Sequence, residues 1–121
     1  MIPIQWKQND KKTMHVNEAE NGVVYLTWPA IEKIEGIRHA FSTRMSKEHL
    51  SSMNLSFSRG DDPANVRENY RRFCEAAGFE VENIVTSDQA HTTKVRYVTK
   101  ADCGSGVTRD RDFHDIDGMI T

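Results

Sequence analysis

Long apolar runs are absent from this sequence, and large aliphatic residues are scarce. It has no run of the ~18 apolar residues that a membrane-spanning helix needs. The first residues, MIPIQWKQNDKK, contain no apolar signal core, so we expect a cytoplasmic protein that does not insert into membranes. Leu, Ile, Val and Phe number 25 of the 121 residues, which predicts a folded chain with a small core.

Neither positive nor negative charge dominates this sequence. The formal net charge is -2, so no polyanionic partner such as nucleic acid is indicated. The two cysteines, Cys74 and Cys103, form no CxxC motif. We therefore expect two reduced thiols rather than a disulfide framework or a paired-cysteine metal site.

Short strand-like segments surround one clear helix in the sequence. Residues 45–60 show no period, as is typical of a functional or mobile loop. Pro29 should end the first strand, because proline cannot donate to a sheet. The expected strands are GVVYLTW (22–28), IRHAFSTR (37–44), NIVTS (83–87), KVRYVTK (94–100) and one that starts at IDGMIT (116–121).

The helix is predicted from Pro63 to Ala77. Asp62 is a good N-cap, Pro63 suits the first helical position and Gly78 suits the stop. This makes the acidic pair of GDDP a capping feature rather than a metal site. Apolar residues recur at helical spacing and should face the core; they are Val66, Tyr70, Phe73 and Ala77. The arginines of the helix should face solvent; they are Arg67, Arg71 and Arg72.

Histidines are the candidate metal ligands, yet no two of the five lie three or four residues apart on a helix. His91, in SDQAHTTKV between two predicted strands, is either a loop residue or a ligand. We expect His39 to be packed and His114 to be exposed. A nucleophilic pair of Cys103 and His91 is weakly indicated, because no helix start follows the thiol. The remaining histidines are His15 and His49.

A polar corner ends the second predicted strand at Ser42, Thr43 and Arg44. Hydroxyls and a guanidinium at a strand end can bind a phosphate or a ribose by charge-assisted hydrogen bonds. A simple turn would use the same residue types, so both interpretations stay open.

Four blocks, taken in order, resemble one family: RHAFSTR, MNLSFSRGDDPANVRENYRRFCEAAGF, IVTSDQAHTTKV and DIDGMIT. It is the YfiH-like or laccase-domain family, which includes multicopper polyphenol oxidases, peptidoglycan editing factor and purine nucleoside phosphorylases. The blocks match from about residue 23 to residue 121. The resemblance implies a layered α+β fold, with residues 1–121 forming the amino-terminal part of a single domain.

The resemblance also implies an activity and a set of site residues. The activity is zinc-dependent phosphorolysis of purine nucleosides such as adenosine and inosine, with an adenosine deaminase side activity and copper in the older interpretation of the family. His91 of the Q-x-H block matches a metal ligand and catalytic residue, and Gln89 lies in the same block. Arg44 and Asn54 match the F-S-T-R and N-L blocks, so the implied substrate-binding residues are Arg44, Asn54 and Gln89. Asp117 matches an acid before a strand.

The family's other two ligands are a cysteine and a histidine, both later in the chain than DGMIT. Cys103 in ADC precedes DGMIT, so we expect it to be a false match. We therefore expect this chain to end before those two ligands and to be inactive alone. The alternatives are a non-enzymatic binding or assembly fragment and a copper-dependent polyphenol oxidase. The expected partners are a purine nucleoside and phosphate, and the sequence leaves oligomerisation open.

Overall fold

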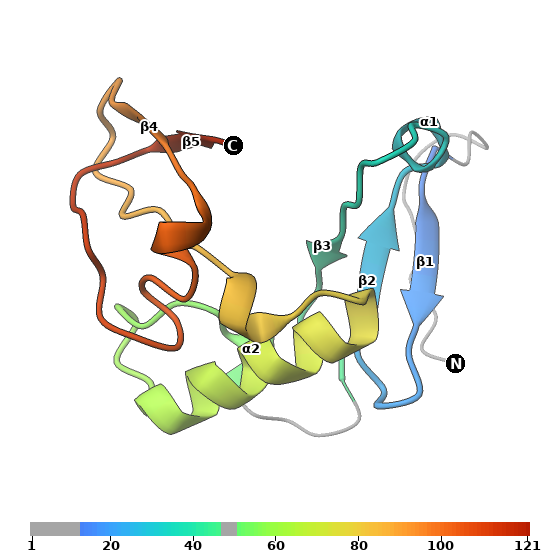
Figure 1. Cartoon of the computed structure of the whole chain (residues 1–121). Helices are drawn as coiled ribbons and strands as arrows, with labels where there is room; N and C mark the ends of the chain where they lie inside the picture. The colour runs from blue at the N-terminus through green and yellow to red at the C-terminus, as the bar shows by residue number, and fades with distance from the viewer. Residues whose placement is uncertain (1–12, 47–50) are drawn as a thin grey trace. The chain divides into compact units, whose positions relative to one another are not determined.

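The computed structural model describes residues 13–46 and 51–121. The chain divides into two compact units, unit 1 (Met1–Gly78) and unit 2 (Phe79–Thr121) (Figure 1). Both units contain strands and short helices, which confirms the predicted α+β class. In the part of the chain that is described, no helix has the length and apolar character needed to cross a bilayer.

Unit 1 contains a three-stranded antiparallel sheet of order β1-β2-β3. Strand β1 (His15–Glu18), which the sequence did not predict, pairs with β2 (Val24–Thr27) through a tight turn. The turn depends on Gly22, whose φ of +84° lets its N–H donate to the Ala19 carbonyl at 2.8 Å. As predicted, Pro29 follows the end of β2, and it begins the short helix α1 (Pro29–Glu32).

Strand β3 (Phe41–Ser42) is much shorter than the strand predicted over residues 37–44. It pairs with β2 through Leu26 opposite Phe41, so the same register would place residue 39 opposite residue 28. The chain turns into α1 there, and the Trp28 N–H donates to His39 Nε2 at 2.7 Å instead. The alternating pattern was wrong for residues 37–40 because their partner strand has already ended.

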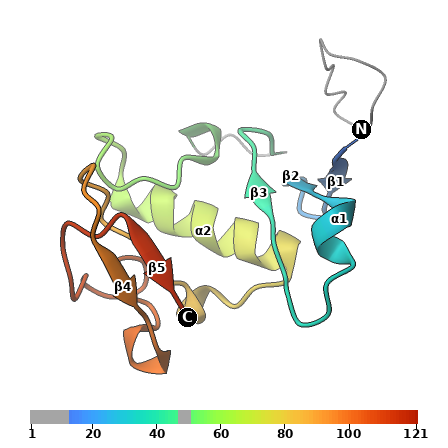
Figure 2. The ribbon, with the colours of Figure 1, turned by 90° about the horizontal axis from the view of Figure 1, so that it is seen from above.

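Helix α2 (Pro63–Ala77) has the predicted bounds and caps. Asp62 accepts from the Ala64 N–H at 2.9 Å, and Gly78 adopts a left-handed conformation at the carboxyl end. The side chain of Asn21, in the β1–β2 turn, donates to the Arg72 carbonyl at 3.0 Å and so joins the turn to α2. In the view of Figure 2 the ribbon of β3 crosses that of α2. The buried apolar residues of unit 1 are Val23, Val24, Leu26, Met53, Val66 and Cys74.

The arginines of α2 were expected to face solvent, and two of them do. Arg71 is exposed and pairs with Glu68 at 2.6 Å. Arg72 is only 13% exposed, because its Nε also binds Glu68, at 3.1 Å. The prediction was therefore wrong for Arg72, whose aliphatic stem packs while its charge is neutralised.

Unit 2 contains a parallel pair of strands, β4 (Val95–Tyr97) and β5 (Gly118–Ile120), within two of the predicted strand segments. The strand predicted over residues 83–87 is wrong. The 3-10 helix η2 (Val81–Asn83) includes the first residue of that segment, and residues 84–86 pair irregularly with the turn at Gly104 and Ser105. Gly104 has a φ of +84°, so the turn has no extended edge to which a strand could add.

One face of the β4–β5 pair is packed and the other is open. Below β4, the Arg96 guanidinium lies 4.6 Å from the ring centre of the buried Phe113. It also pairs with Asp102, in the 3-10 helix η3 (Lys100–Asp102), at 3.0 Å. On the opposite face the side chains of Val95, Tyr97 and Ile120 are all more than half exposed.

Candidate functional site

A cavity of about 670 Å³ lies among the described residues of unit 1. It lies between the end of β3, the 3-10 helix η1 (Ser51–Met53) and the segment that leads into α2. A volume of this size is typical of small-molecule sites. The lining residues are Ser42, Thr43, Arg44, Ser52, Met53, Asn54, Arg59, Gly60 and Asp61.

The strand-end corner contributes three residues to this cavity, but not three free groups. The Thr43 hydroxyl donates to the Val24 carbonyl at 2.6 Å and accepts from the Met45 N–H at 3.2 Å, so it holds the backbone. The exposed Arg44 has no acidic partner in the described ranges. Of the predicted anion-binding corner, the guanidinium of Arg44 and the hydroxyl of Ser42 are the groups available to a ligand.

Asn54 lines the same cavity and also closes the loop that forms it. Its amide nitrogen donates to the Ser56 carbonyl at 3.0 Å and to Asp61 Oδ2 at 3.2 Å. Its amide oxygen accepts from the Ser56 N–H at 3.0 Å. The two amide protons are thus already used, and the side chain shapes the cavity wall more than it presents donors to a ligand.

Helix α2 holds this loop from below. The fully buried Asn69 donates from Nδ2 to the Asn54 carbonyl at 3.0 Å. The next residue, Tyr70, donates from its hydroxyl to the Leu55 carbonyl at 2.7 Å. Its ring stacks on Phe57 with ring centres 6.0 Å apart. The cavity loop is therefore anchored to α2 by Tyr70 of the predicted apolar stripe and by its neighbour Asn69.

The loop that carries Gln89 and His91 lies in unit 2, where a carboxylate clamps it. Asp117 accepts from the Ala90 N–H at 2.7 Å and from the Thr92 N–H at 3.1 Å. These bonds, that of Ala90 foremost, lower the pKa of Asp117. His91, between the two anchored residues, is exposed and has a φ of +59°, a conformation that few residues other than glycine adopt.

A second carboxylate, that of Asp88, joins the start of this loop to the segment just before Asp117. Asp88 Oδ2 accepts from the Asp115 N–H at 3.1 Å and lies 3.3 Å from His114 Nδ1. The Asp115 N–H is the main reason that the pKa of Asp88 is lowered. His114 is 74% exposed, as predicted, and serves as a surface partner of Asp88.

The predicted site residues therefore fall into two groups. Arg44 and Asn54 line one cavity in unit 1, and Gln89 and His91 are exposed on one clamped loop in unit 2. The sequence did not single out Arg59 for a role, although an arginine just before a capped helix was a usable signal. The clamping role of Asp117 had no sequence signal, because its partners are backbone N–H groups.

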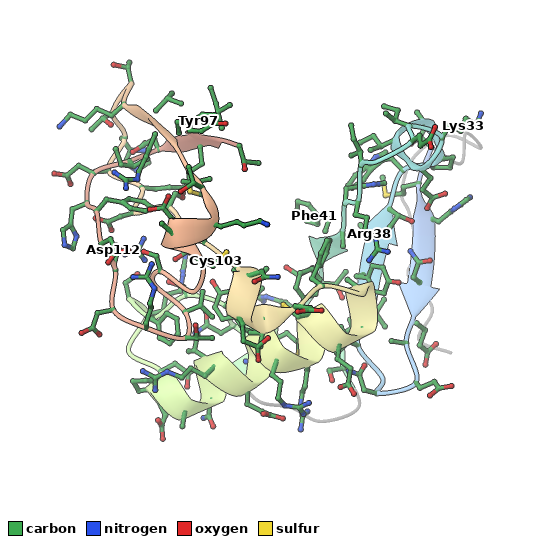
Figure 3. All side chains as sticks on the ribbon, viewed as in Figure 1. Lys33, Arg38, Phe41, Tyr97, Cys103 and Asp112 are labelled. Atoms are coloured by element: carbon green, nitrogen blue, oxygen red, sulfur yellow. The ribbon has the colours of Figure 1, made fainter. Side chains whose placement is uncertain are left out.

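The other candidate residues have structural roles. His39 is packed against Trp28, as predicted, with ring centres 5.9 Å apart. Cys74 and Cys103 form no disulfide with each other, as expected of two reduced thiols; Cys103 is labelled in Figure 3. His15 lies 3.4 Å from Glu32, and His49 lies outside the described residues.

A metal site needs several ligands close together, and catalytic zinc takes three from the protein. Within residues 13–46 and 51–121, no three His, Cys, Asp or Glu side chains gather in a way that could hold a metal ion. Asp117, which accepts from the N–H groups on both sides of His91, is occupied by these backbone donors. The described residues alone do not fit a catalytic zinc or copper ion.

Comparison with known proteins gives consistent matches. The family model described as multi-copper polyphenol oxidoreductase laccase matches residues 38–121. Purine nucleoside phosphorylase YlmD of Geobacillus stearothermophilus is 35% identical over 80 residues, which cover 63% of this chain and 28% of that protein. The crystal structure of YlmD from the same organism superimposes with a TM-score of 0.59 at 26% identity, over 85% of this chain and 37% of that one. The chain thus spans about a third of the length of these relatives.

Proposed function

Because the chain belongs to the multi-copper polyphenol oxidoreductase laccase family, we propose that it serves in the phosphorolysis of purine nucleosides such as adenosine and inosine. The observation that carries the proposal is its 35% identity with a purine nucleoside phosphorylase. The cavity of unit 1 supports it, because its described lining residues all lie in the segment matched to the family and include Arg44, which has no acidic partner among the described residues.

Phosphorolysis needs a bound anion. A phosphate oxygen attacks the anomeric carbon of the ribose, and the glycosidic C–N bond breaks as the purine leaves with its electron pair. Arg44 can hold the attacking phosphate by two parallel N–H···O bonds, and the Ser42 hydroxyl can add a third. Asn54 would keep the cavity open around them, and Gln89 is proposed to hydrogen-bond the purine edge or to orient His91.

His91 is proposed as one ligand of a zinc ion and as a catalytic residue, in keeping with the family resemblance. When bound by a full set of ligands, zinc polarises a bond or lowers the pKa of a water molecule. Because the described residues supply too few ligands for such a site, we assign His91 no chemical step here. The strained conformation of His91 between two anchored residues supports a functional role for this loop.

Two further activities are proposed, adenosine deamination and copper-dependent oxidation of phenols. The adenosine deaminase side activity comes from the family resemblance alone. Copper-dependent oxidation of phenols accords with the family description, but copper oxidation sites need clustered imidazole and thiolate ligands. Elemental analysis after loading with zinc or copper distinguishes the phosphorylase from the oxidase.

The test is calorimetric titration of the protein with inosine and with inorganic phosphate, together with an assay for released hypoxanthine. We expect both ligands to bind. We expect turnover far below the roughly 10 per second of a median enzyme, since His91 has too few co-ligands among the described residues. Arg44→Gln should remove phosphate binding, whereas Lys33→Gln should not, because Lys33 is an exposed cation beside α1 (Figure 3). Failure of the wild-type protein to bind inosine would contradict the proposed function.

A further inference from the structure

We infer that Arg59 is a second phosphate-binding residue, so that the cavity of unit 1 holds a phosphate between Arg44 and Arg59. This inference rests on the function proposed above and deepens it, because that proposal assigns the phosphate to Arg44 alone. The lining of the cavity includes both arginines, although 15 positions separate them in the sequence.

The charges around the cavity favour a dianion. Arg44 and Arg59 are both exposed, and neither has an acidic partner in the described part of the chain. The one acid among the described lining residues is Asp61, whose Oδ2 accepts from Asn54 at 3.2 Å and whose Oδ1 accepts from the Asp62 N–H at 2.8 Å. Asp61 is therefore held by donors of its own loop, and the lining keeps an excess of positive charge.

The loop that carries Arg59 is built to be rigid, which lowers the entropy lost on binding. Asn54 closes it at one end, and Phe57, two positions before Arg59, stacks on Tyr70 of α2 with ring planes 12° apart. Gly60 then turns the chain with a φ of +74°. Arg59 thus lies between two anchored points, where its backbone position is fixed and its side chain remains available.

Phosphate binding at this place needs neither a metal nor unit 2, because every lining residue belongs to unit 1. The phosphate subsite is therefore separable from the proposed role of His91. A phosphate bound directly by two guanidiniums can therefore be distinguished from a phosphate held by a metal ion, because only the second kind of binding needs the metal.

The experiment is calorimetric titration of the whole 121-residue protein with inorganic phosphate in chelator-treated buffer. We expect Arg59→Gln to weaken binding by about tenfold, as for one lost charge-assisted contact. Arg59→Lys should recover part of the affinity, since it keeps the charge but loses the planar fork. Lys33→Gln and His91→Ala should bind as the wild type does. Thermal melts followed by circular dichroism check that each variant is folded.

The outcomes separate this inference from the proposed function. Wild-type affinity in Arg59→Gln, with binding lost in Arg44→Gln, overturns the role of Arg59 and leaves the function standing. Phosphate binding that disappears with the chelator or in His91→Ala overturns the separable subsite. No phosphate binding by the wild type overturns the inference as well, while the inosine titration still decides the function independently.

Discussion

Removing the amide of Asn69 should loosen the cavity from beneath. Asn69 is fully buried in α2 and donates at 3.0 Å to the Asn54 carbonyl, at the point where the cavity loop begins. In Asn69→Ala this part-buried carbonyl loses its donor, which costs about 1–3 kcal/mol. Alanine favours the helix more than asparagine by about 0.5 kcal/mol, which offsets a minor part of the loss. We expect unit 1 to lose about 0.5–2.5 kcal/mol of stability.

Urea unfolding followed by the helical circular dichroism signal measures this change. Asn83→Ala is the matched control, because the Asn83 side chain is exposed and makes no hydrogen bond to the described residues. Tyr70→Phe should fall between the two, at about 0.5–1.5 kcal/mol, since it removes the bond to the Leu55 carbonyl but keeps the ring stack. Phosphate affinity should fall in Asn69→Ala as well. An Asn69→Ala unfolding midpoint equal to that of Asn83→Ala would refute the anchoring argument.

Other perturbations test the loop of His91 and the surface of α2. Asp117→Asn should speed hydrogen exchange at the Ala90 amide, because a neutral acceptor replaces a carboxylate whose pKa is lowered by that N–H. Asp115→Asn is the control, and equal exchange at the Ala90 amide in both variants would contradict the clamp. The pKa of Glu68 is lowered from 4.5 to about 2, chiefly by its bond from Arg71. A lowered folded-state pKa gives stability that is present above pH 4.5 and is lost as the pH falls towards 2. Because this pair is partly exposed, we expect the loss to stay below about 1 kcal/mol, and Glu68→Gln should abolish it; acid titrations that coincide for the two proteins would argue against this assignment.

Local sequence signals predicted the parts of the fold that depend on local chemistry. Helix α2 agrees at both ends, because Asp62, Pro63 and Gly78 act on backbone groups within a few residues. The strand predicted at residues 83–87 failed because the backbone that residues 84–86 pair with is an irregular turn, and a strand needs a partner that its own sequence does not encode.

The candidate site could likewise be predicted from the sequence only in part. The corner at Ser42, Thr43 and Arg44 could be predicted as polar, and it does line the cavity. The use of the Thr43 hydroxyl by the backbone could not be predicted, because the Val24 carbonyl lies on a different strand. The contribution of Arg59 likewise depends on a tertiary contact, since only the folded loop brings it to the cavity that Arg44 lines.

The Asp117 clamp has a consequence for the order in which unit 2 can form. Its bond to the Ala90 N–H closes a separation of 27 positions, so the loop of His91 cannot be set until the chain up to β5 is in place. Closing such a loop costs entropy before any contact repays it. The loop and the β4–β5 pair should therefore open and close as one cooperative segment, and fraying of β5 would release His91 from its strained conformation.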